Sequence, residues 1–288
     1  MVGAQGETDM ADYVSLTAQR QLQVVVPPVS VQRQVAAPIA CLDDLIETNR
    51  RRVKVLEEMA SVIYREWFVR FRYPGSENVP LVDSPFGPIP QGWAVVPLVE
   101  VAEITMGQSP KSEFYNTDGR GKPFHQGVAD FGAHFPTHRK FCTVNARLAQ
   151  DGDVLVSVRA PVGRVNVADT SLVIGRGLGA VRSRLGYQSL LLACLKEVFA
   201  EEDSMGGGTI FNAIGKQELE QVQVVRPSGD LAVAADEALA SMFGLLRSLT
   251  FANRRLSSIR DQLLPKLVAG KIDVSHLDLD ALTEAAIA

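Results

Sequence analysis

The chain has few cysteines and no long apolar run, and both absences limit what it can be. Its three cysteines, Cys41, Cys142 and Cys194, are widely spaced and odd in number. That pattern fits reduced, buried thiols better than a disulfide or zinc framework. No stretch reaches the roughly 18 consecutive apolar residues of a membrane helix, and the polar N-terminus lacks the pattern of a secretory signal. The sequence therefore predicts a cytoplasmic protein with no membrane contact.

Catalytic signatures are missing as well. A phosphate loop for ATP needs Ser or Thr after its glycine-lysine pair, but here Pro, Gln and Ile follow the three such pairs, Gly121-Lys122, Gly215-Lys216 and Gly270-Lys271. No Asp or Glu is followed two residues later by Lys, so the usual carboxylate and lysine pairing of a metal-dependent nuclease is absent. The only Pro-Pro pair precedes Val29 rather than an aromatic residue, which leaves an adenine methyltransferase site unsupported. The sequence predicts a chain without catalytic residues or a cofactor of its own.

Three histidines lie close together in the sequence, His125, His134 and His138. Without a matching Cys or Glu spacing they do not predict a metal site. Loop histidines near phosphate are the simpler interpretation.

Charge is sorted along the chain. The net charge of −4 argues against a protein that coats nucleic acid indiscriminately. Residues 139–184 nevertheless hold eight bases against three acids, whereas the last sixteen residues hold four acids and no Lys or Arg. This sorting is expected if one region meets phosphate and another does not.

A duplicated segment is the strongest pattern in the sequence. The apolar stretch from Leu22 to Pro28, followed by a long periodic run to Asn49-Arg50-Arg51, recurs from Val222 to Pro227 and on to Asn253-Arg254-Arg255. Two copies about 200 residues apart are too distant for a solenoid. We expect a short strand at Val24–Val26, a proline stop and a long helix in the first copy, and the same helix again in the second.

Both runs have the spacing of a coiled-coil seam. From Val35 to Trp67 apolar or small residues alternate at intervals of four and three, with Asn49 in the series. This span predicts a helix about 50 Å long, longer than one turn of B-DNA and thus able to act as a ruler. The second helix is expected from about Asp230 to Leu267, with Arg260 interrupting its apolar stripe.

Because Asn253 occupies the position of Asn49, we expect the two helices to pair antiparallel with pseudo-twofold symmetry. The alternative is two amphipathic helices that pack separately on a core. The pairing predicts contact between Leu42, Ile46, Asn49, Leu56 and Ile63 on the first helix and Leu246, Leu249, Asn253, Leu256 and Leu263 on the second.

The segment between the helices predicts a strand-rich α+β globule. Short strand-like runs at 93–98, 154–158, 165–167 and 173–174 are divided by glycine turns, with one amphipathic helix at about 187–200. Four turns place Gln, Ser, Lys or Arg beside a glycine. Glycine permits close backbone approach, and these side chains can donate hydrogen bonds to base edges or phosphates, so the turns are candidate DNA contacts. The alternative is that they are ordinary turns whose arginines form solvated salt bridges. The candidate DNA contacts are Gln108, Ser109, Lys111, Gln126, Lys140, Arg159, Arg164 and Arg176.

With these features, the sequence resembles the specificity subunit of type I restriction-modification systems. The matching stretches are residues 42–51, 67–69, 87–93, 104–110 and 263–272. The resemblance implies a non-catalytic subunit in which target-recognition domains read halves of a split DNA site and two long helices form an antiparallel coiled coil. It also implies that methyltransferase and restriction subunits, with their S-adenosylmethionine and ATP, are partners.

The resemblance divides the chain into six parts. These are the remnant of a first target-recognition domain at 1–28, a first spacer helix at 29–73, a linker at 74–92, a target-recognition domain at 93–228, a second spacer helix at 229–271 and an acidic tail at 272–288. Two other functions stay open: a structural partner that binds methyltransferase subunits without reading DNA, and an endonuclease. Self-association is a further expectation.

Overall fold

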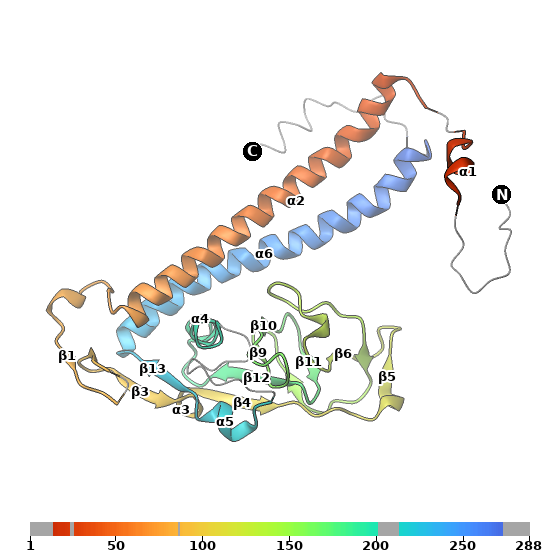
Figure 1. Cartoon of the computed structure of the whole chain (residues 1–288). Coiled ribbons are helices and arrows are strands. Elements are labelled where there is room, and N and C mark those ends of the chain that lie inside the picture. Colours follow the sequence, from red (N-terminus) through yellow and green to blue (C-terminus); the bar gives the residue numbers. More distant parts are fainter. Residues whose placement is uncertain (1–13, 24–25, 86, 201–212, 273–288) are drawn as a thin grey trace. The chain divides into compact units, whose positions relative to one another are not determined.

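The computed structural model describes residues 14–23, 26–85, 87–200 and 213–272. It confirms the predicted fold class: a strand-rich globule and two long helices, α2 (Val29–Tyr64) and α6 (Gly229–Val268), that pack together antiparallel (Figure 1). Residues 24–25 of the expected strand and 273–288 of the expected acidic tail lie outside this description. Among the described residues, no helix combines the length and apolarity that a bilayer crossing requires.

The chain divides into two compact units. One contains residues 1–49 and 252–288, and the other contains residues 50–251. The first unit includes the short helix α1 (Leu16–Arg20), which begins where the Ser15 hydroxyl accepts a hydrogen bond from the backbone N–H of Ala18.

Within this first unit the two asparagines meet. The Asn49 Nδ2 donates to Asn253 Oδ1 at 3.0 Å, and Asn253 Nδ2 donates to the backbone oxygen of Ile46 at 3.1 Å. Ile46 is 2% exposed beside them. Arg260, which interrupts the apolar stripe, pairs with Asp43 at 2.9 Å and so carries its charge to the edge of the seam. The other interface residues expected in this unit, Leu42, Leu256 and Leu263, are half-buried; those that belong to the second unit, Leu56, Ile63, Leu246 and Leu249, are buried or half-buried.

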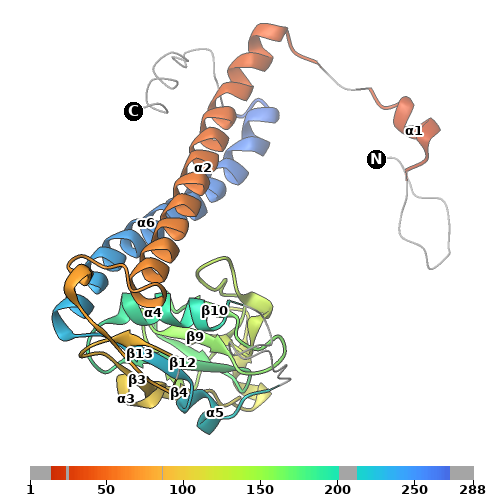
Figure 2. The same cartoon turned by 60° about the vertical axis from the view of Figure 1, so that its left-hand side comes forward.

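In the second unit, β-sheets make up most of the globule (Figures 1 and 2). The antiparallel four-stranded sheet has the order β10-β9-β12-β4, and the five-stranded sheet has the order β5-β7-β6-β11-β8. Their strands are β4 (Ala102–Met106), β5 (Tyr115–Asn116), β6 (Lys122–His125), β7 (Phe141–Cys142), β8 (Leu148–Ala149), β9 (Val154–Ser157), β10 (Val165–Val167), β11 (Leu172–Ile174) and β12 (Leu178–Ser183).

Smaller elements complete this unit. Two short pairs are formed by β1 (Leu81–Val82) with β2 (Ile89–Pro90) and by β3 (Ala94–Pro97) with β13 (Gln223–Arg226), so the segment expected as a linker contains a hairpin of its own. The short helices are α3 (Leu98–Val101), α4 (Gln188–Val198) and α5 (Lys216–Glu220), and single turns lie at Arg65–Val69, Ser76–Asn78, Ser112–Phe114 and Val128–Asp130.

The main core joins the four-stranded sheet to α4 and to the feet of both long helices. Buried Tyr64 and Phe68 pack with Trp93, the Phe68 and Trp93 rings being 5.7 Å apart. From the other helix, Ala235 and Leu239 enter the same core with 0% exposure. The feet of the helices therefore lie inside the hydrophobic interior of the globule, and only two residues separate β13 from α6.

The cysteines form no disulfide. None of the three is bonded to another cysteine, and Cys142 and Cys194 are buried. Burial raises the pKa of the Cys194 thiol to about 11, which makes the reactive thiolate scarce at neutral pH.

Candidate nucleic-acid interface

Four glycine-containing turns that the sequence singled out lie together at one place in the globule. We call them the four-loop cluster: Met106–Lys111, Phe124–Gly127, Ser157–Arg164 and Ile174–Leu178. Backbone hydrogen bonds link them, from Gly107 N to Leu178 O (2.9 Å), Gly175 N to His125 O (2.8 Å), Gly177 N to Gln126 O (3.0 Å) and Val158 N to Gly177 O (2.9 Å). Segments far apart in sequence thus become one surface.

Sheet topology brings these loops together. Strands β6 and β11 are parallel neighbours, so their carboxyl ends run side by side into Gln126 and Gly175. Strands β4 and β9 flank β12, with Met106 opposite Gly179 and Ser157 opposite Leu178. Every loop of the four-loop cluster therefore begins or ends on a strand of one of the two sheets.

The glycines in these loops serve loop packing. A Cβ on Gly107 would lie 2.1 Å from the Gly175 oxygen, and one on Gly177 would lie 2.6 Å from the Gln126 oxygen. The sequence predicted these glycines to be places where the protein backbone could come close to DNA. The structure shows that the loop backbones approach one another, which any larger residue would prevent.

A hollow of about 290 Å³ lies in the four-loop cluster, and among the described residues that line it the charged ones are Arg159 and Arg176. Both arginines are exposed, and neither forms an ion pair with another described residue. Beside them the Ser109 hydroxyl donates to Gln126 Oε1 at 2.8 Å and accepts from the backbone N–H of Arg176 at 3.2 Å. Ser109 therefore fixes both the Gln126 amide and the loop that carries Arg176.

The remaining candidates lie around the hollow or away from it. Exposed Gln108 is held through its backbone, which donates to Ile174 O at 3.0 Å. Exposed Lys111 has Glu113 at 3.8 Å, and exposed Lys140 is held beside β6 because its backbone oxygen accepts from Phe124 N. Arg164 does not line the hollow, although it shares a loop with Arg159.

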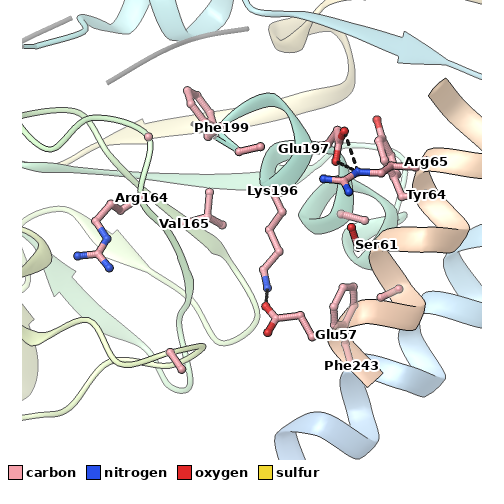
Figure 3. A pocket seen from close by; sticks show the side chains of 15 residues that line it. Glu57, Ser61, Tyr64, Arg65, Arg164, Val165, Lys196, Glu197, Phe199 and Phe243 are labelled. Atoms are coloured by element: carbon pink, nitrogen blue, oxygen red, sulfur yellow. Dashed lines mark hydrogen bonds and ion pairs between the residues drawn. The ribbon is translucent and has the colours of Figure 1, made fainter. Parts of the chain in front are cut away.

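Arg164 instead lines a second cavity of about 360 Å³, where the foot of α2 meets α4 (Figure 3). Two ion pairs cross this junction, Lys196 with Glu57 at 2.5 Å and Arg65 with Glu197 at 2.8 Å. Figure 3 shows Arg164 pointing away from the Glu57 and Lys196 pair. The pairs join helix to globule, and we assign them a structural role.

The positive charge of residues 139–184 does not form a single face. The Arg182 guanidinium binds Asp153, which is 5% exposed, at 2.7 Å. Arg184 donates to the backbone oxygens of Val99 and Ala102, at 3.2 and 3.1 Å. Part of the charge excess seen in the sequence is therefore held by groups of the globule itself, although both arginines are exposed.

The three histidines do not come together. His125 is 0% exposed with its Nε2 3.0 Å from His138 Nδ1, whereas His134 lies 3.7 Å from Glu57. Burial and the His138 ring lower the pKa of His125 from 6.5 to about 4. No group of three or more His, Cys, Asp or Glu in the described ranges has the arrangement of a metal site.

Sequence reasoning missed Tyr115, which supports the four-loop cluster from one side. Its hydroxyl donates to the backbone oxygen of Pro110 at 2.6 Å, and its ring stacks on Phe124 with centroids 4.5 Å apart. Burial raises the pKa of Tyr115, and the nearby Arg176 guanidinium opposes the shift. No spacing in the sequence indicates these contacts.

Comparison with known proteins gives one consistent family. A Methanocaldococcus jannaschii protein, named as the candidate specificity subunit of the type I restriction enzyme MjaX, is 31% identical over 265 residues, covering 91% of this chain and 62% of that protein. The crystal structure of the HsdS subunit from Thermoanaerobacter tengcongensis is 31% identical, covers 93% of this chain and 65% of the other, and has a TM-score of 0.51. This chain belongs to the specificity-subunit family of type I restriction-modification systems.

Further comparisons support the fold. The S subunit of the type I system from M. genitalium is 14% identical with a TM-score of 0.62 and coverage of 89% and 66% of the two chains, and so shares the fold. No family model matches. Specificity subunits are non-catalytic components of the type I complex. The chain spans a little under two thirds of the length of the first relatives.

Proposed function

We propose that this specificity subunit recognises one half of a split DNA site with its four-loop cluster. The observation that carries the proposal is the hollow that Arg159 and Arg176 line, both positively charged, with no acidic residue among the described lining residues. Arginine offers a planar fork of donors to phosphates and to guanine, and the neighbouring Gln126 offers an amide of the kind that pairs with adenine. Ser109 holds that amide in a fixed orientation, which favours base reading over a purely electrostatic contact.

The test is the salt dependence of DNA binding by the full chain. Replacing Arg159 and Arg176 by Ala should weaken binding and reduce the slope of log affinity against log salt by roughly one unit for each phosphate that the protein no longer neutralises. Arg226→Ala is a matched control, because Arg226 is an exposed arginine on β13 that is already paired with Glu100 at 3.2 Å. An unchanged slope in the double variant would show that the four-loop cluster does not bind the DNA backbone.

We also propose that the helix pair binds methyltransferase subunits and, through the complex, the restriction subunit. Four apolar side chains on the helical segment from α2 to the turn after it are exposed, Val55 (52%), Met59 (47%), Val62 (59%) and Val69 (52%). Their spacing of 4, 3 and 7 residues repeats the coiled-coil pattern on a second face of the helix. Exposed apolar stripes of this kind mark protein interfaces.

Co-purification tests this second interface. Met59→Asp with Val62→Asp should abolish recovery of the methyltransferase subunit with the chain, since two charges would be buried without partners. Lys54→Asp, at an exposed polar position of the same helix, should leave recovery unchanged. Equal recovery with the wild type and both variants would exclude this face as the docking surface.

A further inference from the structure

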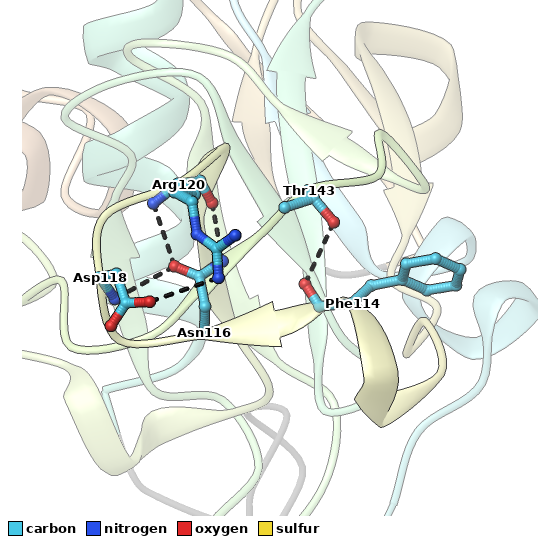
Figure 4. A network of polar contacts seen from close by, with 5 residues as sticks. All are labelled: Phe114, Asn116, Asp118, Arg120 and Thr143. Carbon is cyan, nitrogen blue, oxygen red and sulfur yellow. Dashed lines mark hydrogen bonds and ion pairs between the residues drawn. The ribbon is translucent and has the colours of Figure 1, made fainter.

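The turn between β5 and β6, residues 116–121, is closed by a single side chain (Figure 4). The Asn116 Oδ1 accepts hydrogen bonds from the backbone N–H groups of Asp118 (3.2 Å) and Arg120 (3.0 Å). The Asn116 Nδ2 donates to the backbone oxygen of Arg120 at 2.8 Å. Both ends of the amide are therefore used, and the turn is formed before any ligand arrives.

The base of the turn is also fixed. The Phe114 oxygen accepts from the backbone N–H of Thr143 at 3.1 Å and from its hydroxyl at 3.4 Å. Gly121 has a φ of 88°, and a Cβ there would lie 2.1 Å from the Cys142 oxygen. The turn is thus packed against β7 and has little freedom to shift along it.

This rigid turn presents an acid and a base side by side. The Asp118 and Arg120 side chains are 66% and 72% exposed, and Arg120 Nη2 lies 3.3 Å from Asp118 Oδ2. An exposed ion pair of this kind contributes little to folding stability. Stability therefore does not explain why the turn fixes these two residues side by side. A carboxylate would also weaken a phosphate contact by its neighbour, because it repels the phosphate.

The pair does match the edge of one base pair. Guanine presents its N7 and O6 acceptors to an arginine fork, and the cytosine amino group donates to a carboxylate, both in the major groove. We infer that Asp118 and Arg120 together read one G·C base pair, with Asn116 as the positioning residue. This inference rests on the proposed function and adds a specificity-determining contact outside the four-loop cluster.

The turn lies within reach of the same half-site. It leads directly into β6, which ends one residue before Gln126 of the four-loop cluster. Four residues of strand span about 13 Å, or roughly four base-pair steps of about 3.4 Å. Tyr115, the residue before Asn116, is bonded to the first loop of the four-loop cluster through Pro110. The five-stranded sheet therefore carries the turn at one end of β6 and the Gln126 loop of the four-loop cluster at the other.

The experiment is selection from a random-sequence duplex pool by the full chain co-purified with its methyltransferase subunits. The wild type should enrich a motif that includes a G·C position. Arg120→Ala and Asp118→Asn should each lower the preference at one and the same G·C position by about ten- to a hundred-fold. Arg120→Lys keeps the charge but lacks the fork, and should lower the same preference.

Two further variants separate positioning from folding. Asn116→Ala removes three hydrogen bonds of the turn and should reduce preference at that position alone, with only a small fall in melting temperature because the turn is exposed. Asn116→Asp retains the acceptor and should restore most of the preference. Arg226→Ala, from the exposed pair with Glu100, should enrich the wild-type motif.

The outcomes distinguish this inference from the function on which it rests. An unchanged motif in the Arg120 and Asp118 variants would overturn the inference while leaving the four-loop cluster in place. A uniform fall in affinity with a reduced salt slope and no change of motif would also overturn it, since Arg120 would then bind phosphate. If the wild type enriches no motif, the proposed reading of DNA itself is wrong.

Discussion

The hydrogen-bonded pair of Asn49 and Asn253 predicts that replacing one asparagine and replacing both will have different effects on the free energy of unfolding. Asn253→Ala removes the hydrogen bond from Asn49 (3.0 Å) and the one to the Ile46 oxygen (3.1 Å). Each such bond contributes about 0.5–1.5 kcal/mol, and the half-buried Asn49 amide is left without its acceptor. We expect the free energy of unfolding to fall by about 1–3 kcal/mol.

Replacing both asparagines by leucine should have the opposite effect. No unpaired polar group then remains at these two positions of the seam, and the added apolar area should leave the chain at least as stable as the wild type. Urea denaturation followed by circular dichroism measures both values, and Ser258→Ala, at an exposed position of α6, should stay within about 0.5 kcal/mol. Because residues that touch do not behave additively, a double leucine variant destabilised by as much as the sum for Asn49→Leu and Asn253→Leu would refute the pairing.

Three other predictions follow from the globule. Gly107→Ala should lower the free energy of unfolding by about 2–4 kcal/mol in urea titration, since its Cβ would meet the Gly175 oxygen; Gly127→Ala, which meets nothing within 4 Å, should change little. Phe68→Ala should cost about 3–5 kcal/mol in thermal unfolding, because it empties the aromatic cluster at the foot of α2. The folded-state pKa of His125 is about 4, below its ordinary 6.5. The unfolded chain therefore binds more protons, so stability should fall from pH 6.5 to pH 4 in the wild type and less steeply in His125→Asn.

The helices were the part of the fold that the sequence predicted best. Alternating intervals of four and three, continued over many turns, determine which residues face a partner, and α6 begins and ends within one residue of the expected helix. Long helices depend on local periodicity, so little else is needed to locate them. The end of the first helix was harder to predict. The α-helix α2 stops at Tyr64, and a wider π-helical turn at Arg65–Val69 carries Trp67 and Phe68 into the globule.

The candidate site was predictable only in part. Composition identified the four glycine turns, but their convergence depends on the parallel pairing of β6 with β11, which links residues about 50 positions apart. The candidate DNA contacts in the loops were chosen by amino-acid type alone. Amino-acid type cannot distinguish Arg159, which lines the hollow, from Arg164, which lines the cavity at the foot of α2. The Asn116 turn was missed because its function depends on side chains held at fixed distances.

Because the junction between β13 and α6 is short, it fixes the rotation of α6 about its own axis relative to the globule. Pro227 and Ser228 are the only residues between Arg226, which is paired to β3, and the first turn of α6. One inserted residue would rotate the following helix by about 100°, and the foot of α6 could no longer present Ala235 and Leu239 to the core. Length changes are therefore better tolerated farther along the paired helices, where additions of seven residues keep the seam in phase.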